Sequence, residues 1–172
     1  MSNAEAQQEI YGQLVTLVDN LILLPAVAVS EVGQMDRIEL NAGSPSWLIG
    51  FRELRGQRQP VVCMEALCGG QIPPRSSRAK LVGVRSVSDG PGWAFISQGQ
   101  PHLATLTPNA MKAETLKTSD NKDLVVARTR IANLSAMIPD LAAMENEITE
   151  AAAKASTSQA AAEPWEFGAE AE

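Results

Sequence analysis

The sequence of 172 residues predicts an all-β fold with one substantial helix near its C-terminus. Short runs of β-branched and aromatic residues recur along the chain, and clusters of Gly, Pro, Asp and Asn separate them. About nine short strands with turn signals between them are typical of small β-barrels and sandwiches. A long helical periodicity appears only after Pro139, where Leu141, Met144 and Ile148 fall on one face.

Composition and charge exclude several classes of partner. Hydrophobic residues make up 45% of the chain, charged residues 20%, and the formal net charge is −6. Nucleic acids and anionic lipid surfaces bind clustered Lys and Arg, so we expect no nucleic-acid partner. No apolar run approaches the ~20 residues that span a bilayer, and the N-terminus lacks the features of a signal peptide. We therefore expect a cytoplasmic protein without direct membrane insertion.

The chain offers little to an enzyme or a metal ion. In the cytoplasm Cys63 and Cys68 would be reduced, buried structural thiols, and with a single histidine they form no zinc-binding pattern. That histidine, His102, lies near a turn, so we expect an exposed or structural role and no Ser–His–acid triad. The sequence contains no Gly-rich phosphate loop. We expect a non-enzymatic protein with no cofactor.

In the N-terminal part, strands and tight turns alternate. Residues 1–9 are polar and expected to be disordered. Residues 14–25 predict two strands, and Asp19–Asn20 between them tolerate the backbone of a two-residue hairpin turn. Pro25 favours a short helix over residues 25–29. A further strand is expected within Val32–Leu40.

The stretch Trp47–Leu67 has the strongest local pattern. Two apolar runs flank a polar segment containing Gly56, which predicts a hairpin because glycine adopts the positive φ of a tight turn. Pro60 confines its part of the second strand to an edge or to the strand's start. Helical spacing over Met64–Cys68 predicts a short helix next. The polar segment carries three arginines and so predicts a basic tip: Arg52, Arg55 and Arg58.

The C-terminal part is predicted from the same signals. Strands are expected over residues 80–87, 93–97, 102–107, 124–131 and 136–138. Pro108–Thr118 is undecided, apart from one helical turn around Ala110 and Met111. Arg128 and Arg130 should share a strand face. Pro139 should open the helix, and its acidic residues should face water: Glu145, Glu147 and Glu150. The Ala-rich acidic tail, residues 154–172, is expected to be disordered.

The stretch Trp47–Leu67 resembles the signature region of the CheW-type coupling proteins of bacterial chemosensory arrays. The matching features are a glycine after an apolar strand, a Leu-Arg-Gly turn, and Pro-Val-Val before a short helix: Gly50, Leu54-Arg55-Gly56 and Pro60-Val61-Val62. Leu24-Pro25 followed by Val29-Ser30-Glu31-Val32 is also similar to that family. Phe51-Arg52-Glu53 and the preceding loop ending at Trp47 are more similar to the pilus-associated, ChpC-like group than to the flagellar type.

The resemblance implies one CheW-like domain over residues 10–153, with two small SH3-like β-barrels side by side. It also implies a signal-transduction adaptor or scaffold in chemotaxis or twitching motility, within a two-component system. Its partners would be the regulatory domain of a CheA-type histidine kinase and the cytoplasmic tip of methyl-accepting chemoreceptors. Only the part up to Leu67 carries recognisable motifs, and an acidic, valine-rich segment common in the second half of the family is missing.

The candidate partner-binding residues are the hairpin arginines, the turn glycine, one residue of the Val-x-Glu-Val element and two tail aromatics: Arg52, Arg55, Arg58, Gly56, Val32, Trp165 and Phe167. A guanidinium pairs bidentately with carboxylates, so arginines suit docking onto an acidic surface. An aromatic pair in an acidic tail suits a docking peptide. Ordinary surface charges and an incidental tail are the alternatives.

Two other functions fit the same pattern. One is a small β-barrel module that binds a ligand or a protein and is unrelated to chemosensing. The other is an accessory CheW homologue that occupies array positions without activating the kinase.

Overall fold

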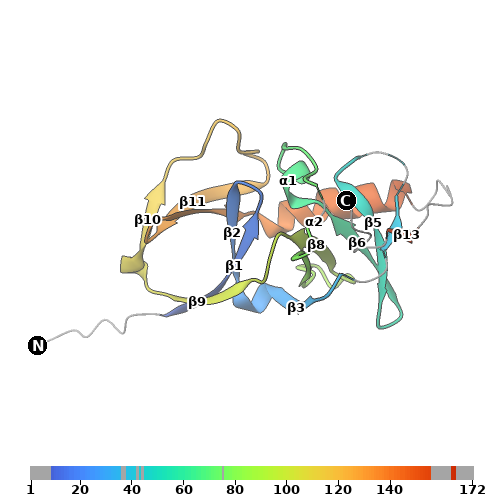
Figure 1. Ribbon diagram of the computed structural model, residues 1–172, viewed down its shortest axis with the longest axis horizontal. Helices are drawn as coiled ribbons and strands as arrows, with labels where there is room; N and C mark the ends of the chain where they lie inside the picture. Colours follow the sequence, from blue (N-terminus) through green and yellow to red (C-terminus); the bar gives the residue numbers. More distant parts are fainter. Residues whose placement is uncertain are drawn as a thin grey trace, which may run out of the picture.

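The chain folds into two β-sheets that lie side by side, with one long helix packed where they meet (Figure 1). The computed structural model describes residues 9–35, 38–41, 43, 45–74, 76–155 and 164–165. Residues 1–8, expected to be disordered, lie outside the described residues. The predicted fold class, all-β with a C-terminal helix, is confirmed.

Each sheet collects strands from both halves of the chain. The first sheet has the order β10-β11-β12-β2-β1-β9. Its strands are β1 (Ile10–Leu17), β2 (Asn20–Pro25), β9 (His102–Leu106), β10 (Met111–Glu114), β11 (Val125–Ile131) and β12 (Leu134–Pro139). The second sheet has the order β13-β4-β5-β6-β8-β7-β3. Its strands are β3 (Val29–Gly33), β4 (Ile38–Leu40), β5 (Leu48–Leu54), β6 (Gln57–Val62), β7 (Lys80–Val84), β8 (Trp93–Ser97) and β13 (Pro164–Trp165).

One parallel pairing in each sheet joins the two halves of the chain. β12 pairs with β2 in the first sheet, and β6 pairs with β8 in the second, while the other pairings are antiparallel. The helical elements are η1 (Ala26–Ala28), α1 (Met64–Leu67), η2 (Pro108–Ala110) and α2 (Leu141–Ala155). The predicted short helices after Pro25 and Val62, and the helical turn near Ala110, are therefore confirmed.

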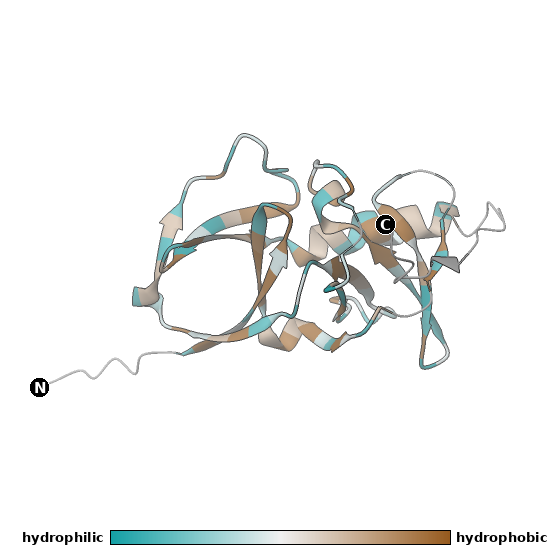
Figure 2. Cartoon of the chain, viewed as in Figure 1, coloured by the Kyte–Doolittle hydropathy of each residue, from teal (hydrophilic) through white to brown (hydrophobic). Residues whose placement is uncertain are grey.

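Alternating side chains divide the core into three clusters. On β8, Trp93 and Phe95 face the largest cluster, whereas Ala94 and Ile96 face a smaller one within the second sheet. The third cluster lies within the first sheet and includes Leu23. The largest cluster takes residues from both sheets and from α2, and Figure 2 shows hydrophobic residues concentrated there. The two sheets therefore share their main core.

Helix α2 presents its predicted apolar stripe to that core. Met144 and Ile148 are buried in it, and Leu141 packs against it. The predicted start at Pro139 is wrong, because Pro139 is the last residue of β12. Asp140 caps the helix instead: its Oδ1 accepts a hydrogen bond of 3.0 Å from the Ala143 amide.

Three other local predictions need correction. The β1–β2 turn consists of Val18 and Asp19, with Asp19 at a φ of 58°, while Asn20 already belongs to β2. The single strand expected within Val32–Leu40 is wrong, because β3 begins at Val29 and β4 is separate. Strand β10 follows η2 in the segment left undecided, where pairing with β11 compensates for a sequence of weak β propensity.

Glu145 contradicts the expectation that the acidic residues of α2 all face water. Its side chain is buried, whereas Glu147 and Glu150 are exposed. The Glu145 carboxylate accepts hydrogen bonds from the Val87 amide, at 3.2 and 3.3 Å, and from the Ser88 hydroxyl, at 2.9 Å. These hydrogen bonds hold the loop between β7 and β8 against α2.

Candidate partner-binding site

The β5–β6 hairpin projects beyond the body of the second sheet and ends in a two-residue turn (Figure 1). The turn residues are Arg55, at a φ of 52°, and Gly56, at a φ of 78°, and Leu54 pairs with Gln57 on either side. Positive φ at both central residues is the requirement of the hairpin turn whose twist matches that of the strands. The turn leaves the Arg55 side chain exposed at the extreme end of the hairpin.

Arg58 lies on the flank of the hairpin and is held there by two contacts. Its guanidinium carbon lies 3.9 Å from the centroid of the Phe51 ring, and its Nη2 lies 3.6 Å from Glu39 Oε2. About half of the Arg58 side chain remains exposed. The stacked, half-exposed guanidinium keeps free donors for an incoming carboxylate.

Arg52 is not part of an exposed tip, which corrects the expectation of three clustered arginines. Only 4% of the residue is exposed, and its Nη2 lies 2.7 Å from Glu31 Oε1 on β3. Its Nε donates a hydrogen bond of 3.1 Å to Gln59 Oε1. The polar segment was expected to form the tip, but β5 continues to Leu54 and turns Arg52 to the side opposite Phe51.

The Arg52 guanidinium reaches β3 because β7 has a glycine in between. A Cβ on Gly83 would lie 2.5 Å from Ser30 Oγ and 3.3 Å from Arg52 Nη2. β3 and β5 are not neighbours in the sheet, so this ion pair spans the curved second sheet. Gln59 continues the chain of contacts, since its Nε2 donates a hydrogen bond of 2.6 Å to the Pro91 carbonyl.

Val32 lies on β3, at the edge of the second sheet opposite β13. It pairs with Val82 of β7 and is half-buried. Among the described strands β3 pairs with β7 alone, so its other side presents backbone groups of an edge strand. The structure therefore unites Arg55, Gly56 and Arg58 on one hairpin and places Val32 apart from them.

Of the two predicted C-terminal aromatic residues, the structure describes one. The backbone of Trp165 belongs to β13, where Pro164 pairs with Glu39 and Trp165 with Ile38. Phe167 lies outside the described residues. The tail, residues 154–172, was expected to be disordered, and most of it also lies outside the described residues. Its first two residues belong to α2, which extends to Ala155.

A cleft of about 420 Å³ lies where the two sheets meet, between the β1–β2 turn and the loop after α1. Asp19, Glu65 and Asp120 are among its lining residues, and Glu65 Oε1 accepts a hydrogen bond of 3.1 Å from the Val18 amide. This contact ties the first sheet to α1. The sequence did not predict this cleft, because its lining comes from segments far apart in the chain.

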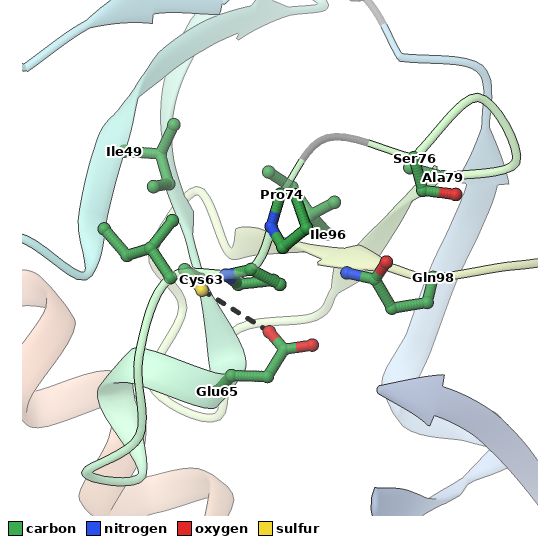
Figure 3. A pocket seen from close by; sticks show the side chains of 10 residues that line it. Ile49, Cys63, Glu65, Pro74, Ser76, Ala79, Ile96 and Gln98 are labelled. Carbon is green, nitrogen blue, oxygen red and sulfur yellow. Dashed lines mark hydrogen bonds between the residues drawn. The ribbon is translucent and has the colours of Figure 1, made fainter. Parts of the chain in front are cut away.

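A smaller apolar pocket lies beside this cleft, under the loop that contains Pro73 and Pro74 (Figure 3). Cys63 lies in its wall, and its thiol donates a hydrogen bond of 3.4 Å to Glu65 Oε2, drawn as a dashed line in Figure 3. Burial raises the pKa of Cys63 to about 12, and burial likewise raises the pKa of Cys68 to about 12. Both thiols therefore stay protonated and unreactive at neutral pH.

Chemistry-bearing residues do not converge elsewhere in the described part of the chain. His102 is exposed on β9. No group of three or more His, Cys, Asp or Glu side chains among the described residues is arranged to hold a metal ion. Within the same residues, no helix combines the length and apolarity needed to cross a membrane. The surface hairpin remains the most distinctive feature for binding a macromolecule.

Comparison with known proteins identifies this architecture. Residues 12–148 match the CheW-like domain family. The fold is similar to the crystal structure of the scaffolding protein TtCheW from Thermoanaerobacter tengcongensis, with a TM-score of 0.69 and 17% sequence identity. That similarity covers 84% of this chain and 92% of the other. No curated protein sequence matches the chain.

Proteins of the CheW family are non-enzymatic scaffold or adaptor proteins of chemotaxis signalling. The family match covers well over half of the sequence. The chain belongs to the CheW family.

Proposed function

We propose that this protein couples chemoreceptors to a CheA-type histidine kinase in the cytoplasm, in a pilus-associated pathway that controls twitching motility. It would bind the regulatory domain of the kinase with one surface and the helical tip of a methyl-accepting chemoreceptor with another. Simultaneous binding raises the effective concentration of one partner near the other, so receptor conformation can bias the kinase.

The projecting β5–β6 hairpin carries this proposal. Its turn holds the Leu-Arg-Gly motif, and the exposed Arg55 side chain stands at its end. The stacked Arg58 adds a second guanidinium on the same hairpin. Two arginines on a rigid, protruding hairpin suit recognition of an acidic surface.

The filled interiors of the sheets argue against the alternative of a ligand-binding barrel. Buried side chains form one such cluster within each sheet, including Leu23 and Leu106 in the first and Ile38 and Val61 in the second. The apolar pocket beside Cys63 holds only about 20 Å³. For the part of the chain that the structure describes, this packing favours a protein surface over an internal cavity as the binding feature.

The direct test is a calorimetric titration of the protein with the regulatory domain of the CheA-type kinase from the same cell, at moderate salt. We expect saturable binding. The Arg55→Glu variant should bind at least about tenfold more weakly, because it places a carboxylate where a guanidinium is expected to meet an acidic surface.

Lys122→Glu provides the matched control, since Lys122 is exposed in a turn after β10, away from the hairpin. It makes the same change of charge and should leave the affinity unchanged. Both variants should unfold within about 0.5 kcal/mol of the parent, because each alters an exposed side chain. Equal losses of affinity in the two variants, or a flat titration of the folded parent, would contradict the proposal.

Binding of the receptor tip and docking by the C-terminal tail are separate predictions. Edge strand β3, with Val32, is a candidate surface for the receptor tip. Trp165 and Phe167 remain candidate docking residues in the tail. Titration of the same variants with a receptor-tip fragment would show whether the receptor also uses the hairpin.

A further inference from the structure

The C-terminal segment covers a sheet edge that would otherwise be open. β13 consists of Pro164 and Trp165 and pairs antiparallel with β4. β4 is the outermost strand of the second sheet apart from β13. An uncovered edge strand presents unpaired amide and carbonyl groups and is a ready site for an added strand.

The covered strand is connected to the hairpin through Glu39. The backbone of Glu39 pairs with Pro164 on one side and with Phe51 of β5 on the other. The Glu39 carboxylate contacts Arg58, and Arg58 stacks on the Phe51 ring. β13 therefore lies one strand away from the hairpin that carries Arg55.

The charge of the C-terminal sequence is complementary to the charge of the hairpin. The last ten residues, 163–172, contain four glutamates and no Lys or Arg. The hairpin bears two exposed arginines, Arg55 and Arg58. The sequence that carries β13 is thus opposite in charge to the hairpin, as an acidic partner would be.

We propose that the C-terminal segment around Pro164–Trp165 is an intramolecular guard of the β4 edge that competes with partner docking at the β5–β6 hairpin. The competition rests on the proposed function of the hairpin. The pairing of the guard with β4 does not, so the two can be tested separately.

The size of β13 suits a guard that can be displaced. Two paired residues give few hydrogen bonds, and proline has no amide hydrogen to donate. Pro164 also limits the addition of a further strand outside β13. The eight residues 156–163 that join α2 to β13 keep the segment at a high effective concentration near β4. A partner of ordinary affinity can still replace it.

The first experiment needs no partner. Hydrogen exchange over Ile38–Leu40 is compared in the full chain and in a chain ending at Ala160, which keeps all of α2 and lacks β13. We expect exchange over β4 to become at least about twofold faster in the shortened chain. A synthetic peptide of residues 161–172 should bind the shortened chain and bind the full chain several-fold more weakly. Unchanged exchange, or equal peptide binding to both chains, overturns the proposal.

The second experiment measures competition with the kinase regulatory domain. A molecule is closed when β13 pairs with β4 and open when it does not. Removing the closed state raises the apparent affinity for the kinase domain by the ratio of total to open molecules. We expect an increase of about 2–10-fold for the shortened chain. Trp165→Pro, which removes an amide of β13, should reproduce the increase. Ala169→Pro, the same kind of change beyond β13, should not.

The outcomes separate the two proposals. If neither chain binds the kinase domain, the proposed function of the hairpin fails, and the exchange and peptide measurements still decide whether the guard exists. If the kinase domain binds both chains with equal affinity, the competition is overturned even when β4 loses protection.

Discussion

Arg128 and Asp120 form a two-point ion pair that is almost closed to solvent. Arg128 Nε lies 2.6 Å from Asp120 Oδ2, and its Nη2 lies 2.7 Å from Oδ1. The two side chains are only 1% and 4% exposed. Arg128 Nη2 also donates to Asn20 Oδ1 over 2.9 Å, so the pair joins β11, β2 and the turn before β11.

This pair makes stability depend on pH in the acid range. Hydrogen bonding to Arg128 holds the pKa of Asp120 below its ordinary value of 3.8. The unfolded chain therefore binds this proton more readily than the folded chain does. The stabilisation is complete above the unfolded pKa and disappears as the pH falls through the lower folded pKa.

Asp120→Asn tests that dependence. We expect the variant to lose about 3–5 kcal/mol of unfolding free energy at pH 7, because one charge of a buried pair is left unpaired. Urea unfolding between pH 2.5 and 7 should show the difference from the parent shrinking below about pH 4. Asp123→Asn, at an exposed position three residues away, should change stability little at any pH. A constant difference for Asp120→Asn across this range would contradict the assignment.

Glu145 provides a second buried contact to test. Glu145→Gln keeps the shape of the side chain but replaces a carboxylate that accepts from Val87 and Ser88. We expect a loss of about 1–3 kcal/mol in urea unfolding, since hydrogen bonds to charged groups contribute that much. Glu147→Gln changes an exposed neighbour on the same helix and should stay within about 0.5 kcal/mol of the parent. Equal effects of the two substitutions would show that the buried carboxylate does not fasten the β7–β8 loop.

Sequence reasoning located elements whose signals are local. The β5–β6 hairpin was predictable because a turn glycine stands between two apolar runs, and α2 because its apolar residues repeat at helical spacing. β10 was not, because Met111–Glu114 has little β propensity and depends on pairing with β11. The single strand expected within Val32–Leu40 failed for a related reason, since β3 and β4 lie at different places in the second sheet.

Within the candidate site, the sequence predicted the exposure of a side chain only where that side chain lies in the hairpin turn. Arg55 occupies a two-residue turn, so its position at the tip follows from the local pattern. The burial of Arg52 depends on Glu31, which is 21 residues away, and on the absence of a side chain at Gly83. The burial of Glu145 depends on a loop 57 residues away. Such partners become neighbours only when the sheets close.

The two flanking arginines of the hairpin should differ in their contribution to stability. Arg52→Met keeps an apolar stem but leaves Glu31 and Gln59 without their buried partner, and we expect a loss of about 1–3 kcal/mol. Arg58→Met removes an exposed ion pair with Glu39 and should cost less than about 1 kcal/mol. Chemical unfolding of both variants makes the comparison. A smaller loss for Arg52→Met than for Arg58→Met would contradict the burial of Arg52.

Gly50 should tolerate no side chain, because the backbone of the neighbouring strand β4 lies against it. A Cβ added at Gly50 would overlap the backbone carbonyl of Glu39, and backbone cannot move aside as a flexible side chain can. We expect Gly50→Ala to lose about 1–3 kcal/mol or more of unfolding free energy, as overpacked sites do. Gly33→Ala is the matched control, since nothing lies within 4 Å of an added Cβ there. The two variants are compared by urea unfolding and by hydrogen exchange over Ile38–Leu40. Faster exchange of β4 in Gly50→Ala alone would show that the glycine keeps β4 against β5, whereas equal stability of both variants would show that β4 does not pack as closely as this contact requires.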